Sequence, residues 1–111
     1  MLPKKNRADK KDIDLLFKEV KFVNFPNLTF KYSLTSDKEK KISFIAPKSV
    51  AKLAVKRNLL RRRGYSVLKK YLDQFPSGLL GIFVFKKYQE DALILENEIK
   101  TILKNLFNKI N

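Results

Sequence analysis

The sequence predicts an α+β sandwich with the order α-β-β-β-α-β-α, in which helices pack on a four-stranded sheet. Two patterns predict it. Apolar residues alternate with polar ones in parts of the first half, as in strands, and recur every three to four residues in three other stretches, as in helices. Because 111 residues suffice for one core but not for two, we expect a single domain, residues 1–111.

The first predicted helix lies near the N-terminus, where Asp9 or Asp12 is a suitable cap. Its apolar face contains Ile13, Leu16, Phe17 and Val20. Two extended segments follow, residues 22–25 and 28–34, separated by a Pro-Asn turn. Residues 36–39 are polar and predict a hairpin loop before a third strand at 41–46.

A long helix is predicted from Val50 to Tyr71 or Leu72, with Ser49 as its cap. Its core stripe consists of Leu53, Leu60, Gly64, Val67 and Tyr71. Glycine in a helix interior costs about 1 kcal/mol, so Gly64 indicates a close approach of helix and sheet.

An almost purely apolar strand, residues 79–85, is expected at the centre of the sheet. A last helix begins at Asp91. Its predicted buried side contains Leu93, Leu95, Ile99, Ile102, Leu103, Leu106 and Ile110.

Composition excludes several function classes. The chain has no Cys and no His, which rules out disulfides, Cys-based metal sites and Ser-His triads. No apolar run approaches the roughly 18–20 residues needed to span a bilayer. Residues 1–11 are too charged for the apolar stretch of a signal peptide, so we expect no membrane partner.

Charge is the main functional signal. Lys and Arg number 25 against 11 Asp and Glu, a net charge of +14. Residues 48–70 contain nine basic residues and no acidic one. Like charges at i,i+4 repel by a few tenths of a kcal/mol per pair, so such a helix favours a phosphate-bearing partner. A solvated helix face and a small ribosomal-type RNA-binding protein remain open alternatives, whereas a DNA-binding zipper lacks its heptads.

The basic stretch resembles the protein subunit of bacterial ribonuclease P, whose hallmark is an Arg-Asn pair in a basic helix entered through a Lys-rich loop. Residues 48–62 read KSVAKLAVKRNLLRR, with the pair at Arg57 and Asn58. Residues 2–7 and 12–18 also resemble the family's opening and first helix. The chain departs from the family at two positions. It has Tyr65 where the family often has Arg, and Ile13 where the family usually has an aromatic residue.

The resemblance implies a ribonuclease P protein-like fold, similar to the second domain of ribosomal protein S5, and a cytoplasmic ribonucleoprotein. This endoribonuclease removes the 5′ leader from precursor tRNA. One protein is expected per catalytic RNA, which carries the active site and binds most of the Mg²⁺. No catalytic or metal-binding residue is therefore expected in the protein.

The resemblance also implies three binding regions. The catalytic RNA would be contacted by Lys48, Lys52, Lys56, Arg57, Asn58, Arg61 and Arg62. The leader would lie in a cleft lined by Ile13, Phe17, Thr29 and Lys31, where an aromatic ring can stack on a base. A further RNA contact would come from Lys4, Lys5 and Arg7.

Overall fold

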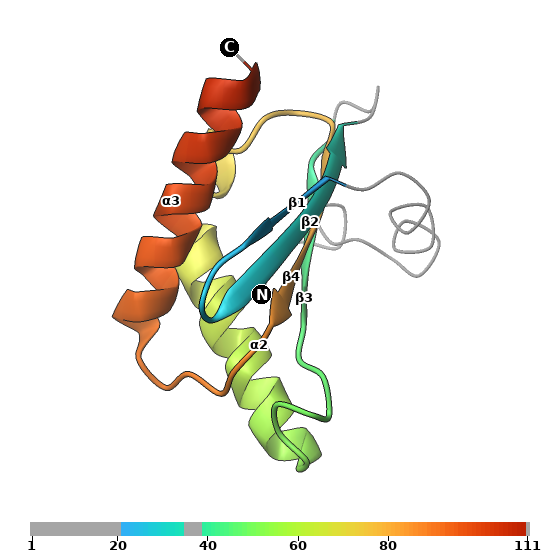
Figure 1. Ribbon diagram of the computed structural model, residues 1–111, viewed down its shortest axis with the longest axis vertical. Coiled ribbons are helices and arrows are strands. Elements are labelled where there is room, and N and C mark those ends of the chain that lie inside the picture. The colour runs from blue at the N-terminus through green and yellow to red at the C-terminus, as the bar shows by residue number, and fades with distance from the viewer. Residues whose placement is uncertain (1–20, 35–38, 111) are drawn as a thin grey trace.

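The computed structural model describes residues 21–34 and 39–110, and the side chains up to residue 106. Its four strands are β1 (Lys21–Asn24), β2 (Leu28–Leu34), β3 (Lys41–Ile45) and β4 (Leu79–Phe85). They form one sheet in the order β1-β2-β4-β3 (Figure 1). Strand β2 is antiparallel to both β1 and β4, whereas β3 is parallel to β4. The predicted strands and the central place of β4 are confirmed.

The helices are α2 (Ala54–Lys69) and α3 (Ala92–Ile110), with a short 3-10 helix, η2 (Leu72–Gln74), after α2. Both long helices cover the same face of the sheet (Figure 1). We call the opposite face the far face. The predicted α+β class is confirmed, and the predicted first helix lies outside the described residues.

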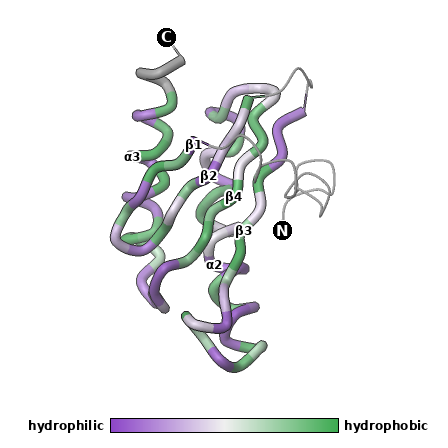
Figure 2. Tube along the Cα trace, turned by 45° about the vertical axis from the view of Figure 1, so that its right-hand side comes forward, coloured by the Kyte–Doolittle hydropathy of each residue, from purple (hydrophilic) through white to green (hydrophobic). Residues whose placement is uncertain are grey.

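The core between sheet and helices is aromatic. Phe30, Phe83 and Phe44 are adjacent across β2, β4 and β3, and all are buried. The ring centroids of Phe30 and Phe83 are 4.4 Å apart, and those of Phe83 and Phe44 are 4.8 Å apart. Strand β4 is hydrophobic along its length (Figure 2), because its far-face residues Leu80 and Ile82 are buried as well.

Helix α2 touches the sheet at Gly64, as the sequence predicts. A Cβ atom on Gly64 would lie 2.6 Å from Cε1 of Phe44, closer than real Cβ contacts. The next residue, Tyr65, packs edge-on against the same ring, with centroids 5.0 Å apart. Its hydroxyl accepts a hydrogen bond from the backbone N–H of Phe44, at 3.1 Å. The edge strand β3 is thereby fixed to α2.

Helix α3 is fixed by a buried carboxylate that periodicity does not reveal. Glu98 Oε1 accepts the backbone N–H groups of Asn27, at 3.2 Å, and Leu28, at 3.1 Å. Its Oε2 accepts the side-chain amide of Asn27, at 2.6 Å. Gln89 Nε2 donates to Asn27 Oδ1, and Arg63 donates to the carbonyl of Gln89 at 2.7 Å. One network therefore joins the β1–β2 turn, both helices and the β4–α3 loop.

The predicted start of the long helix is wrong, because α2 begins at Ala54 and not at Val50. The carbonyl of Pro47 accepts the backbone N–H groups of Val50, at 3.0 Å, and Ala51, at 3.3 Å. These bonds close a turn directly after β3, so Ser49 lies in that turn and does not cap the helix.

Two further expectations are wrong. Leu53 and Leu93, predicted to be buried, are 63% and 61% exposed. Leu53 precedes α2 and Leu93 lies in the first turn of α3, and a helical wheel does not show where a helix leaves the sheet that it covers. The predicted hairpin is also wrong: the strands on either side of residues 36–39, β2 and β3, do not pair with each other, because β4 lies between them.

Gly64→Ala is expected to destabilise the fold, because the rings of Phe83 and Tyr65 hold Phe44 on two sides. The overpacking penalty of about 1–3 kcal/mol exceeds the gain of about 1 kcal/mol in helix propensity. Urea unfolding of the full chain measures the difference. Ser66→Ala, at an exposed position of the same helix, is the control and should change the free energy of unfolding by less than about 0.5 kcal/mol. A stabilised Gly64→Ala variant would contradict the close approach.

Candidate nucleic-acid interface

The basic residues named from the sequence gather at the N-terminal end of α2 and on the loop before it. That end of α2 projects beyond the edge of the sheet (Figure 1). The exposed members of the set are Lys48, Lys52, Lys56, Asn58 and Arg62, whereas Arg57 and Arg61 are half-buried. The structure therefore brings all seven to one end of one helix.

Arg57 shapes this end from within. Its Nη1 donates hydrogen bonds to the carbonyls of Ala51, at 3.0 Å, and Lys52, at 2.7 Å. The guanidinium thereby holds the loop that carries Lys48 and Lys52 against the first turn of the helix. Asn58 accepts a hydrogen bond from Arg61 through Oδ1, which orients that second guanidinium. The Arg-Asn pair thus positions neighbouring cations besides presenting its own polar groups.

The electrostatics of this end are unfavourable in the free protein. The positive pole of a helix dipole lies at the N-terminus, where a cation costs up to about 1 kcal/mol and an anion gains as much. The first turn of α2 contains no acidic residue, and Leu53 gives no side-chain cap. Like-charged side chains, the dipole and uncapped N–H groups all favour an anion here.

Apolar side chains are exposed among these cations, a feature that the sequence analysis missed. Leu53 and Val55 are 63% and 60% exposed, and Leu59 is also exposed. Hydrophilic and hydrophobic residues are mixed along this end of the chain (Figure 2). The surface therefore combines cations of the kind that bind phosphate with exposed apolar side chains.

Two neighbouring positions face inward instead. Arg63 donates to the carbonyl of Gln89 and belongs to the network around Glu98. Tyr65, which stands where the resembled family often has Arg, is only 7% exposed and packs on Phe44. In this chain that position stabilises the core and supplies no cation to the interface.

Thr29 and Lys31 lie on the far face, in the middle of the sheet. Lys31 is paired with Phe22 of β1 and Ile82 of β4, and Thr29 with Asn24 and Val84. Thr29 Oγ1 donates to Asn24 Oδ1 at 2.7 Å. Phe22, which the sequence analysis assigned only to a strand, is 58% exposed beside Lys31. Its alternation with the buried-side residue Val23 is the signal that places it on this face.

The other named positions lie outside the described residues. These are Ile13 and Phe17, expected in the cleft, and Lys4, Lys5 and Arg7, expected to contact RNA.

Within residues 21–34 and 39–110, no three His, Cys, Asp or Glu residues lie together as a metal-ligand set. Neither of the described helices is both long and apolar enough to cross a membrane.

Comparison with known proteins gives a match over nearly the whole chain. Residues 2–110 match the family model described as Ribonuclease P. The chain is 35% identical over 101 residues to a ribonuclease P protein component from Borrelia duttonii, covering 91% of this chain and 87% of the relative. The identity and coverage are the same for the Borrelia recurrentis component.

Solved structures show the same fold. The ribonuclease P protein of Thermotoga maritima aligns with a TM-score of 0.78 at 17% identity, covering 89% of this chain and 96% of that one. The Staphylococcus aureus protein aligns with a TM-score of 0.78 at 14% identity, covering 94% and 96%. At these identities the likeness concerns the fold alone.

Proposed function

Because this chain belongs to the family of bacterial ribonuclease P protein components, we propose that it binds the catalytic RNA through α2 and the precursor-tRNA leader through the far face. The observation that carries the proposal is the family match over residues 2–110. The cationic end of α2 and the far face supply two separate surfaces for two RNA partners. We further propose one protein per RNA, acting in the cytoplasm.

The end of α2 suits a structured RNA. Lys56, Arg62 and the oriented Arg61 present cations in different directions around this end of α2, and contacts from such residues to phosphates fix a protein's orientation on a nucleic acid. Arg contacts phosphate through two parallel hydrogen bonds, which fixes orientation as well as affinity. The loop held by Arg57 adds Lys48 and Lys52 beside them.

The far face suits a single strand. A base can stack on the exposed ring of Phe22 while the ammonium of Lys31 approaches the adjacent phosphate, since the two residues are cross-strand partners. Thr29 adds a hydroxyl in the neighbouring row. These contacts distinguish a precursor with a leader from mature tRNA, because only the precursor has the strand that fills them.

The chemistry itself is proposed to belong to the RNA. Within the described residues no three His, Cys, Asp or Glu side chains come together, and no protein-held Mg²⁺ is part of this proposal. Mg²⁺ bound by the RNA would supply charge neutralisation and an activated water for phosphodiester hydrolysis. The protein's residues would bind and orient the two RNAs.

Reconstitution tests the function directly. The full chain, combined with a bacterial ribonuclease P RNA, Mg²⁺ and labelled precursor tRNA at moderate salt, should release the 5′ leader. The protein alone with Mg²⁺ should cleave nothing. Cleavage without RNA that is abolished by substituting one of the protein's own carboxylates would overturn the proposal. Preferential recovery of ribosomal RNA in a pull-down would favour a ribosomal-type RNA-binding protein.

Arg62→Ala is expected to weaken binding to the ribonuclease P RNA about tenfold, because one charge-assisted hydrogen bond is lost. The slope of log affinity against log salt should also become shallower by roughly 0.9 for each lost phosphate contact. Filter binding over a range of salt concentrations measures both effects. Lys87→Ala, at an exposed position after β4, is the charge-matched control. Equal losses in both variants would mean that α2 acts only as diffuse charge.

Phe22→Ala and Lys31→Ala are expected to lower affinity for precursor tRNA with a leader of several nucleotides roughly tenfold, and hardly to change affinity for mature tRNA. Single-turnover cleavage at saturating protein should be largely kept, because no reacting group is removed. Lys21→Ala is the control, since Lys21 is the strand neighbour of Phe22 and its side chain points to the opposite face. An equal loss with mature tRNA would rule out leader binding by the far face.

A further inference from the structure

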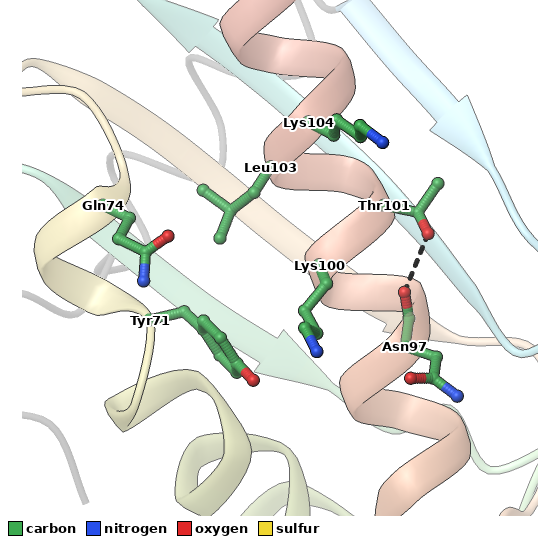
Figure 3. Close-up of a pocket in the computed structure, with 7 residues that line it drawn as sticks. All are labelled: Tyr71, Gln74, Asn97, Lys100, Thr101, Leu103 and Lys104. Carbon is green, nitrogen blue, oxygen red and sulfur yellow. Dashed lines mark hydrogen bonds between the residues drawn. The ribbon is translucent and has the colours of Figure 1, made fainter.

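A pocket lies at the other end of α2, between η2 and the exposed side of α3. Its volume is about 970 Å³. That size is typical of small-molecule and nucleotide sites. Figure 3 shows its walls, with Tyr71 and Gln74 facing one side of α3. The seven lining residues are Tyr71, Gln74, Asn97, Lys100, Thr101, Leu103 and Lys104.

The wall toward α2 and η2 is aromatic and held in place. The hydroxyl of Tyr71 donates a hydrogen bond to Glu96 Oε1, which fixes the ring beside α3. This bond raises the pKa of Tyr71 and lowers the pKa of Glu96, so the tyrosine stays neutral and the carboxylate stays ionised. Leu103, half-buried opposite, gives a second apolar surface. The pair suits a flat ring such as a nucleobase.

The wall formed by α3 is cationic. Lys100 and Lys104 are exposed one turn apart, and no carboxylate is among the seven lining residues. Glu96, beside the pocket, is engaged by Tyr71, and the charges of Lys70 and Lys100 act on it. The Cβ atoms of Lys100 and Lys104 lie about 6 Å apart, because the two residues are one helical turn apart.

Neutral polar groups complete the lining. Gln74 and Asn97 contribute side-chain amides, each with donors and an acceptor, which suit the edge of a base. Thr101 Oγ1 donates to the carbonyl of Asn97, at 2.8 Å, which leaves its oxygen as an acceptor. Tyr71, Gln74, Leu103 and Lys100 lie on one side of the pocket, and Asn97, Thr101 and Lys104 extend its lining over the outer side of α3 (Figure 3).

We propose that this pocket binds a nucleotide of single-stranded RNA, with the base between Tyr71 and Leu103 and its phosphates at Lys100 and Lys104. The site is separate from the cationic end of α2, because Arg57 and Lys69 are twelve positions apart along the helix, a rise of about 18 Å. It also lies on the helix-covered side of the sheet, away from Phe22 and Lys31. It therefore stands or falls independently of the two surfaces proposed above.

The test is an NMR titration of the ¹⁵N-labelled full chain with single-stranded hexauridylate. Saturable shifts are expected at the amides of Thr101 and Leu103 and at the Leu103 methyl groups. The double variant Lys100→Gln with Lys104→Gln should weaken the affinity reported by these signals roughly tenfold, because two phosphate contacts are lost. The slope of log affinity against log salt should become shallower by about 0.7 for each lost contact. Lys86→Gln with Lys87→Gln removes the same charge at exposed positions outside the pocket and should leave that affinity unchanged.

A second probe changes the RNA and leaves the protein unaltered, so its result does not depend on whether a variant folds. An abasic hexamer with the same phosphates should bind the pocket at least fivefold more weakly than hexauridylate, because only the base can stack on Tyr71. Equal binding of the abasic strand, of inorganic phosphate or of poly-glutamate at the same signals would overturn the assignment to a nucleotide. Shifts confined to the far face or to the N-terminal end of α2 would overturn the site itself.

Discussion

The placement of both helices depends on one buried carboxylate, that of Glu98. It accepts three hydrogen bonds from the β1–β2 turn, two of them from buried backbone N–H groups. Hydrogen bonds to a charged group contribute about 1.5–3 kcal/mol each, against a total stability of about 5–15 kcal/mol for a small domain. Through Asn27 and Gln89 the same network reaches Arg63, so α2 and α3 share one anchor.

That anchor divides α2 into two parts. The second half is fixed to the β4–α3 loop by Arg63 and to the sheet by Gly64 and Tyr65. At Gly64 no side chain separates the helix backbone from the ring of Phe44. The first half passes beyond the sheet, and of its side chains only Leu60 is fully buried. Val55, Lys56 and Leu59 are consequently exposed, and Arg57 and Arg61 are half-buried. The interface is thus a consequence of where the close contact with the sheet lies along the helix.

Sequence patterns predict the parts of this fold that depend on periodicity. Alternation over residues 28–34 placed β2 with its inward and far-face residues correctly, and the apolar run at 79–85 predicted a central strand. The close approach at Gly64 was predictable, because glycine in a helix interior lowers helix stability and is therefore expected where a side chain would not fit. The start of α2 was not, because a turn held by the carbonyl of Pro47 competes with helix over the same residues.

The candidate site was predictable in part. Charge density identified residues 48–70 as the cationic segment, and the resemblance to the family narrowed the candidate set to positions 48–62. The inward role of Arg57 was not visible, because its partners are backbone carbonyls, which leave no pattern in the sequence. Glu98 was hidden for a similar reason: in an amphipathic helix an acid normally reads as surface, and only the folded turn supplies its three donors. The free end of α2 combines three unfavourable features: repulsion between cations, cations at the positive pole of the helix dipole, and exposed apolar side chains. A bound polyanion would offset the first two by its charge, and contact with its bases or sugars would cover the third. An RNA bound at this end, as proposed, would stabilise the folded chain by mass action.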